Sequence, residues 1–157
     1  MIRLLILGPT GSMGRLITEL ALKDDKIDVV AACDVKDIGK TLQSIVATED
    51  RNKIVLEDIS NLADIIKRTT PEVAVDFTTA KATEINCLTC VQNGVKCVIG
   101  TTALSQEFLM EFKKAVKVNS APTVISPNMA SGMNVFFKIV QQLSHYLNEW
   151  DIEIIEA

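Results

Sequence analysis

Short apolar runs alternate with segments of helical periodicity along most of this chain, and this alternation limits the folds open to it. The runs cover residues 2–7, 28–33, 54–56, 73–77, 95–99 and 123–125. Most are apolar throughout rather than at every second residue, which is typical of parallel strands covered on both faces. Because strands that alternate with helices form βαβ units, the pattern predicts an α/β fold with a doubly wound parallel sheet.

The segments between these runs have the spacing of helices. We expect helices over residues 13–21, 62–68, 82–93 and 106–116, whereas residues 36–53 show no clear pattern. In the first helix, apolar residues recur at a spacing that forms one stripe: Met13, Leu16, Ile17, Leu20 and Ala21. Gly94 is placed to end the third helix and Ser105 to cap the fourth. A further helix is predicted over residues 132–147, and residues 150–157 begin like another strand.

Charge and hydropathy exclude some classes of partner. The formal net charge of the 157 residues is −4, and acidic and basic residues are interspersed, so the chain lacks the basic stripe of a nucleic-acid-binding surface. No apolar run approaches the ~20 residues of a membrane span. The first apolar run leads into glycines rather than a cleavage site, unlike a signal peptide. We therefore expect a cytoplasmic protein without a nucleic-acid or membrane partner.

The four cysteines fit this compartment. Cys87 and Cys90 have C-x-x-C spacing, which occurs in zinc sites and redox pairs. However, Cys33 and Cys97 lie in separate predicted strands, and Cys87 and Cys90 lie inside a helical pattern rather than at its start. We therefore predict buried free thiols and no metal site.

Three glycines join the first predicted strand to the first predicted helix. Gly8, Gly11 and Gly14 form G-x-x-G-x-x-G, a relative of the dinucleotide-binding fingerprint. Gly8 would permit a tight turn, Gly11 a close approach of the backbone to a diphosphate, and Gly14 close packing of helix on strand. The N–H groups at the start of a helix favour an anion, so the loop predicts a phosphate site.

Asp34 ends the second predicted strand, 20 residues after Gly14. A dinucleotide-binding fold places there the carboxylate that accepts hydrogen bonds from the adenosine ribose. A carboxylate repels a 2′-phosphate, so Asp34 favours NADH over NADPH. Lys36 or Lys40 could partly neutralise Asp34, which leaves NADPH open.

Polar residues follow three later strands. They are Thr78 and Thr79, Thr101 and Thr102, and Ser126, Pro127 and Asn128. In a parallel sheet these positions share the carboxyl edge, where open α/β folds bind ligands.

Four segments together resemble the dihydrodipicolinate reductase family. They are GPTGSMG at residues 8–14, VDFT at 75–78, VIGTT at 98–102 and SPNMASGMN at 126–134. Their order and spacing match that family across almost the whole chain. The resemblance implies a Rossmann-like dinucleotide-binding domain over residues 1–130 and, over 131–157, the truncated start of an α+β substrate-binding and oligomerisation domain.

The resemblance also implies NADH- or NADPH-dependent reduction of 4-hydroxy-tetrahydrodipicolinate, a cyclic dicarboxylate, to tetrahydrodipicolinate in lysine biosynthesis. The glycine loop would hold the diphosphate and adenosine half, and the later segments would flank the nicotinamide. The implied cofactor-binding residues are Gly8, Pro9, Thr10, Gly11, Ser12, Met13, Gly14, Asp34, Phe77, Thr78, Gly100, Thr101, Thr102, Ser126, Pro127, Asn128 and Met129. The full-length family enzyme is a homotetramer.

This chain departs from the family pattern in places. Ser12 replaces a common arginine, and Ala103 replaces the usual glycine after GTT. The histidine-rich substrate motif that follows IEIIEA in the family is absent, so we expect this piece to contain no catalytic residue and to be inactive alone. His145 is expected to be exposed and non-catalytic.

Two alternatives remain open from the sequence. The chain could be a non-catalytic NAD(H)-sensing module, since it carries no acid or base for the reaction. It could also belong to another dehydrogenase of small substrates with the same glycine loop and Asp34, although SPNMASGMN argues against this.

Overall fold

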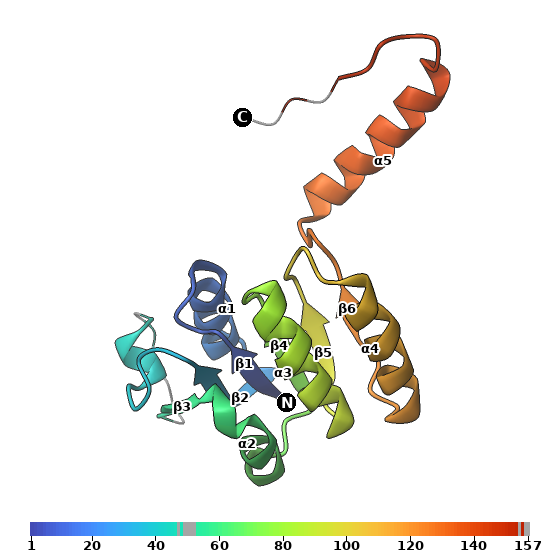
Figure 1. Cartoon of the computed structure of the whole chain (residues 1–157). Coiled ribbons are helices and arrows are strands. Elements are labelled where there is room, and N and C mark those ends of the chain that lie inside the picture. Colours follow the sequence, from blue (N-terminus) through green and yellow to red (C-terminus); the bar gives the residue numbers. More distant parts are fainter. Residues whose placement is uncertain (47, 49–52, 154, 156–157) are drawn as a thin grey trace. The chain divides into compact units, whose positions relative to one another are not determined.

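The computed structural model describes residues 1–46, 48, 53–153 and 155, and divides into two compact units, Met1–Ser126 and Pro127–Ala157. The first unit contains one parallel sheet with the strand order β3-β2-β1-β4-β5-β6 (Figure 1). The strands are β1 (Ile2–Leu7), β2 (Ile27–Asp34), β3 (Leu56–Asp58), β4 (Val73–Asp76), β5 (Lys96–Ile99) and β6 (Val124–Ile125). This order confirms the predicted Rossmann-like α/β fold, because the chain starts at β1 in the middle and winds outward in both directions.

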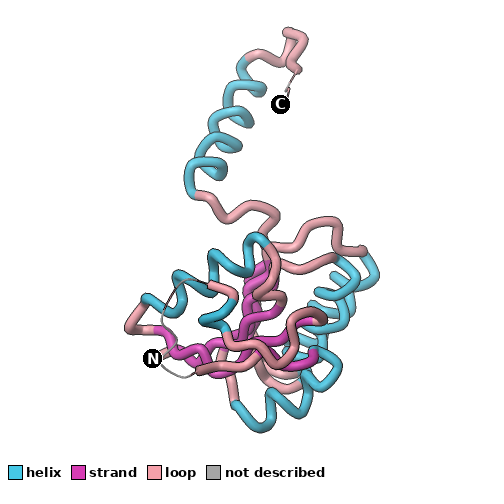
Figure 2. Tube along the Cα trace, turned by 90° about the vertical axis from the view of Figure 1, so that its left-hand side faces the viewer, coloured by secondary structure: helices cyan, strands magenta, loops and turns pink. Residues whose placement is uncertain are grey.

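Helices lie on both sides of the sheet (Figure 2). The α-helices of the first unit are α1 (Ser12–Lys23), α2 (Leu62–Thr69), α3 (Ala80–Gln92) and α4 (Gln106–Val118). Short 3-10 helices, η1 (Leu42–Ser44) and η2 (Ile59–Asn61), lie before β3 and α2. The predicted α-helices are thus all present, and η1 lies in the stretch that gave no clear pattern.

The central strand β1 divides its side chains between two apolar cores. Leu5 and Leu7 pack into the core beneath α2, α3 and α4, whereas Leu4 and Ile6 pack into the core that α1 and η1 cover. All four are at most 5% exposed. A strand buried on both faces must be apolar at every position, which explains why these runs lack alternation.

The cysteines confirm the predicted burial. All four are free and at most 1% exposed. Burial raises the pKa of the Cys33 thiol from its ordinary 9.0 to about 12, because the thiolate would lose its hydration. Among the residues that the structure describes, no group of histidine, cysteine and carboxylate side chains could hold a metal ion.

The orientation of α1 differs from the apolar stripe that the sequence suggested. Ala21 is the buried member of that stripe, whereas Leu16 and Leu20 are 55% and 68% exposed. The buried positions of the helix are Gly14, Thr18 and Ala21. The close approach of Gly14 to the preceding loop therefore sets which face of the helix meets the sheet.

Helix ends follow the predicted signals. The Ser105 side chain accepts a hydrogen bond from the Phe108 N–H at 3.1 Å and caps α4. Gly94, with φ +77°, follows the end of α3 in the left-handed conformation.

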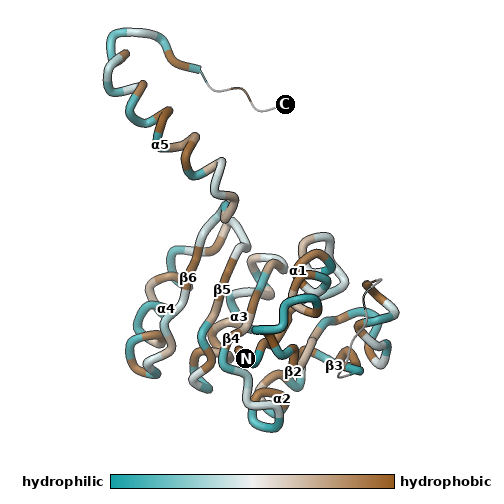
Figure 3. The backbone as a smooth tube through the Cα atoms, turned by 180° about the vertical axis from the view of Figure 1, so that it is seen from behind, coloured by the Kyte–Doolittle hydropathy of each residue, from teal (hydrophilic) through white to brown (hydrophobic). Residues whose placement is uncertain are grey.

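The second unit comprises Pro127–Ala157. It contains α5 (Ser131–Tyr146), along which hydrophobic and hydrophilic residues alternate (Figure 3). Residues 151–153 and 155 form no strand, and the rest of the strand expected after Trp150 lies outside the described residues. None of the helices described is long and apolar enough to cross a membrane.

Candidate functional site

The glycine loop forms a compact connection between β1 and α1. A Cβ atom added to Gly14 would lie 2.0 Å from the Gly8 carbonyl oxygen and 2.9 Å from Pro9 Cα, so only glycine fits there. Gly8 has φ +73°, which glycine adopts without steric cost. Both observations agree with the roles predicted for the first and third glycines.

At the start of α1, backbone N–H groups find no acceptor among the residues that the structure describes. Its first intrahelical bond runs from the Arg15 N–H to the Gly11 carbonyl at 2.9 Å, and no side chain caps the helix. The N–H groups of Ser12, Met13 and Gly14 precede that bond, and the first turn carries no acidic residue. An uncapped N-terminus of this kind attracts an anion.

A cavity of about 340 Å³ opens beside this loop. Its volume lies in the range of small-molecule sites, about 300–1,000 Å³. The lining comes from the glycine loop, the ends of β2 and β4, and the starts of η2 and α3: Gly8, Gly11, Cys33, Asp34, Val35, Lys36, Ile59, Phe77, Thr78, Thr79, Ala82 and Asn86.

Asp34 ends β2 and lines this cavity, and hydrogen bonds from the chain hold its carboxylate in place. Thr10 donates to Oδ2 through its backbone N–H at 3.1 Å and its hydroxyl at 2.7 Å. The N–H groups of Val35 and Lys36 donate to Oδ1 at 2.7 and 3.3 Å. Thr10 therefore fixes the position of the carboxylate relative to the glycine loop.

Two basic residues lie on the segments that flank Asp34. Lys36 lines the cavity, and Arg15 donates from Nε to the Thr10 carbonyl at 3.0 Å. Lys40 instead pairs with Asp37 at 2.7 Å. Of the two lysines considered from the sequence, Lys36 is the one that lines the cavity.

The tips of β4 and β5 pack against each other and against the glycine loop. A Cβ atom on Gly100 would lie 2.0 Å from the Phe77 ring, and one on Gly8 would lie 2.5 Å from Thr78 Cγ2. Phe77 and Gly100 are thus side by side, as are Gly8 and Thr78. The predicted segments 8–14, 77–78 and 100–102 belong to one edge of the sheet.

The threonine hydroxyls at this edge point inward. Those of Thr78 and Thr101 lie 2.8 and 3.1 Å from Asp76 Oδ1, and Thr101 is only 8% exposed. Sequence reasoning considered these residues for cofactor contact, yet their hydroxyls are engaged within the protein. Thr102 is exposed, and Ala103 next to it has φ +59°.

The last predicted segment spans both units. The Ser126 N–H bonds the Ile99 carbonyl at 3.0 Å and so belongs to the sheet, whereas Pro127, Asn128 and Met129 belong to the second unit. Within that unit the Asn134 side chain donates to the Asn128 carbonyl at 3.0 Å.

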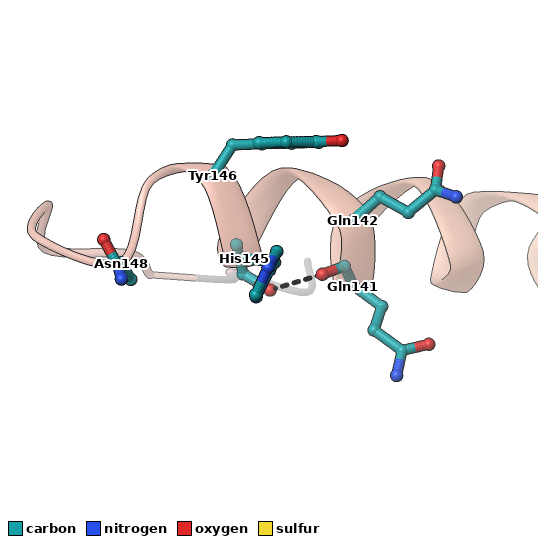
Figure 4. Close-up of a pocket in the computed structure, with 6 residues that line it drawn as sticks. Gln141, Gln142, His145, Tyr146 and Asn148 are labelled. Carbon is teal, nitrogen blue, oxygen red and sulfur yellow. Dashed lines mark hydrogen bonds between the residues drawn. The ribbon is translucent and has the colours of Figure 1, made fainter.

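His145 is exposed, as expected, on α5. With Tyr146 and polar neighbours it borders a shallow hollow, and these side chains all come from this helix and the turn after it (Figure 4). Among the described residues, this hollow is lined by one helix and its final turn alone, unlike the concave sites that enclose most small ligands.

Sequence reasoning missed part of the cavity wall. Ile59 and Asn86 were not considered, and Ala82 was assigned only to a helix. Ala82 and Asn86 follow the spacing i, i+4 and share one face of α3, and Thr79 precedes the first turn of this helix. That spacing was available in the sequence, but the direction in which the face points depends on the packing of α3 against β4 and β5.

Comparison with known proteins agrees with this geometry. The family model "Dihydrodipicolinate reductase, N-terminus" matches residues 2–129. The 4-hydroxy-tetrahydrodipicolinate reductase of Methanococcoides burtonii is 39% identical over 97% of this chain and 57% of that protein. The enzyme of the same name from Methanocaldococcus jannaschii is 37% identical over 99% of the chain and 58% of that protein.

Solved structures give the same result. The dipicolinate-bound dihydrodipicolinate reductase from Paenisporosarcina sp. TG-14 has a TM-score of 0.74 and 30% identity, over 93% of this chain and 54% of that one. The amine dehydrogenase of Mycobacterium smegmatis, at 20% identity and a TM-score of 0.63, shares the fold, over 79% of this chain and 38% of that one. The chain spans somewhat more than half the length of the curated relatives it matches, and it belongs to the dihydrodipicolinate reductase family.

Proposed function

We propose that this chain binds NADH or NADPH at the carboxyl edge of its sheet and supplies the cofactor-binding part of a 4-hydroxy-tetrahydrodipicolinate reductase. The observation that carries the proposal is the cavity that joins the uncapped start of α1 to Asp34. The bare backbone at Gly11 allows a diphosphate to approach the free N–H groups of Ser12 and Met13. Asp34 then faces the adenosine ribose.

In this role the protein positions the reactants, and the cofactor supplies the hydride. The glycine loop binds the diphosphate, and the tips of β4 and β5, with Ser126 beside them, flank the nicotinamide. The relatives' names support a cyclic dicarboxylate substrate, handled by a second domain that begins near residue 131. For the whole protein we propose a cytoplasmic homotetramer. Family membership disfavours an NAD(H)-sensing module or a different dehydrogenase.

Titration of the chain with NADH, followed by nucleotide fluorescence or calorimetry, tests the proposal. We expect saturable binding without oxidation of NADH in the presence of the substrate. Absence of binding at millimolar NADH would contradict it.

Cofactor preference follows from the charges in the cavity. Because Asp34 repels a 2′-phosphate, we propose that NADH binds more tightly than NADPH. Asp34→Asn should bring the dissociation constants of NADH and NADPH closer together. Lys36→Met should move them further apart. Asp64→Asn is the matched control, since Asp64 is 84% exposed on α2 and outside the cavity. An unchanged ratio in both cavity variants would show that these charges do not set the preference.

A further inference from the structure

A buried carboxylate lies beneath the tips of β4 and β5. Asp76, the last residue of β4, has no exposed surface, so it cannot touch a bound cofactor. Its Oδ1 atom accepts from the Thr78 N–H at 2.9 Å and lies within 2.8 to 3.1 Å of three threonine hydroxyls. They belong to Thr78, Thr83 and Thr101.

These donors come from three separate segments. Thr78 lies in the loop after β4, Thr83 is a fully buried residue of α3, and Thr101 lies in the loop after β5. The Thr83 hydroxyl also lies 2.8 Å from Thr101 Oγ1. One acceptor therefore ties both strand tips to the first turns of α3. Buried polar networks of this kind hold their members in one arrangement when every donor has an acceptor.

The segment that this network holds carries free donors. Among the described residues we find no acceptor for the backbone N–H groups of Thr101 and Thr102. Thr101 does not line the cavity beside Asp34, whereas Thr78 does. The loop after β5 therefore lies beyond the adenosine side of the site, where the proposed function puts the nicotinamide.

We propose that Asp76, assisted by Thr83, is a positioning residue that holds the Thr101 segment in place for the nicotinamide half of the cofactor. This inference rests on the proposed function. The adenosine half binds through the glycine loop and Asp34, so its affinity depends less on the network. Loss of the network should thus lower the affinity for NADH more than the affinity for ADP-ribose, which lacks the nicotinamide.

Two pairs of variants test the proposal in the intact chain. Asp76→Ala removes the acceptor, and Asp76→Asn keeps an oxygen that can face the hydroxyls. Thr83→Val removes one hydroxyl at nearly constant volume, and Thr83→Ser keeps it. Thr89→Val is the matched control, because Thr89 lies on the same helix and its hydroxyl donates to the Ile85 carbonyl rather than to Asp76.

The dissociation constants of NADH and ADP-ribose are measured for each variant. We expect Asp76→Ala and Thr83→Val to weaken the binding of NADH about tenfold and that of ADP-ribose less than about twofold. Asp76→Asn and Thr83→Ser should restore the affinity for NADH. Should Asp76→Ala fail to fold, the Thr83 pair gives the same comparison. Equal losses for both ligands in the folded Thr83→Val chain, or no loss for either, would overturn the proposal. Failure of the unaltered chain to bind NADH would instead refute the proposed function.

Discussion

Two alanine substitutions in the glycine loop separate folding from cofactor binding. In Gly14→Ala the new Cβ would lie 2.0 Å from the Gly8 carbonyl oxygen, whereas atoms of this kind normally stay beyond 3.0 Å. The neighbours are backbone atoms of Gly8 and Pro9, so α1 must move by about 1 Å relative to the loop. Overpacking of this kind costs about 1–3 kcal/mol of folding free energy.

Gly11→Ala meets no such obstacle. Its Cβ would lie 3.6 Å from the Gly8 carbonyl oxygen, an ordinary contact, and its φ of −70° suits any residue. Gly11 is the N-cap of α1, where alanine is less favourable than glycine, so the unfolding free energy should fall by no more than about 1 kcal/mol. In the proposed binding mode the diphosphate lies against the backbone at Gly11, so the added methyl group would crowd the cofactor. We expect NADH affinity to fall by about two orders of magnitude, or about 2.7 kcal/mol.

Urea unfolding and NADH titration of both variants check this reasoning. Gly132→Ala in α5 serves as the control, since its Cβ would meet nothing within 4 Å. A Gly11→Ala chain that folds normally and binds NADH as tightly as the unaltered chain would refute a diphosphate at this loop. A Gly14→Ala chain of unchanged stability would refute the close contact between α1 and the Gly8 carbonyl.

Two further substitutions test the backbone and the core. Ala103→Gly should maintain or raise the unfolding free energy, by up to about 1 kcal/mol, because Ala103 has φ +59°, which glycine adopts without steric cost. In the same urea assay, Ala115→Gly should lower the unfolding free energy by about 1 kcal/mol, because Ala115 lies inside α4. For Cys33, the folded pKa of about 12 lies above the ordinary 9.0, so its contribution to stability is complete below pH 9 and is lost as the pH rises toward 12. Between pH 8 and pH 10 the unaltered chain should lose about 1.4 kcal/mol more than Cys33→Ala, measured by urea unfolding under reducing conditions. Equal losses would show that the Cys33 thiol titrates normally in the folded chain.

The order of strands and helices could be predicted because each strand of the sheet is a short apolar run and each helix has its own periodicity. Asp34 could be placed because strand β2 ends where the apolar run ends. The orientation of α1 could not be predicted from apolar spacing, because the contact between Gly14 and the Gly8 carbonyl turns Leu16 and Leu20 outward. A backbone contact of this kind leaves no trace in hydrophobic periodicity.

The same limit applies to the threonines that follow the strands. Their positions after β4 and β5 suggested side chains that face a ligand, but their hydroxyls point to Asp76, which is 25 residues from Thr101 in the chain. The available signal was a charged residue inside the apolar run 73–77, since a carboxylate in a buried strand requires donors from elsewhere. The identity of those donors depends on which strands are neighbours, and a single sequence does not specify that.

The packing contacts along the carboxyl edge imply that its loops respond together to a bulky substitution. Gly8 packs on Thr78, Phe77 packs on Gly100, and Asp76 bonds the residues that follow both. Packed interiors transmit displacement because they contain little free volume. A bulky side chain at Gly100 must displace the Phe77 ring, and Phe77 is covalently joined to both Asp76 and Thr78. A displaced Phe77 ring therefore reaches the glycine loop through β4, whereas a substitution at nearly constant volume, such as Thr83→Val, leaves these packing contacts in place.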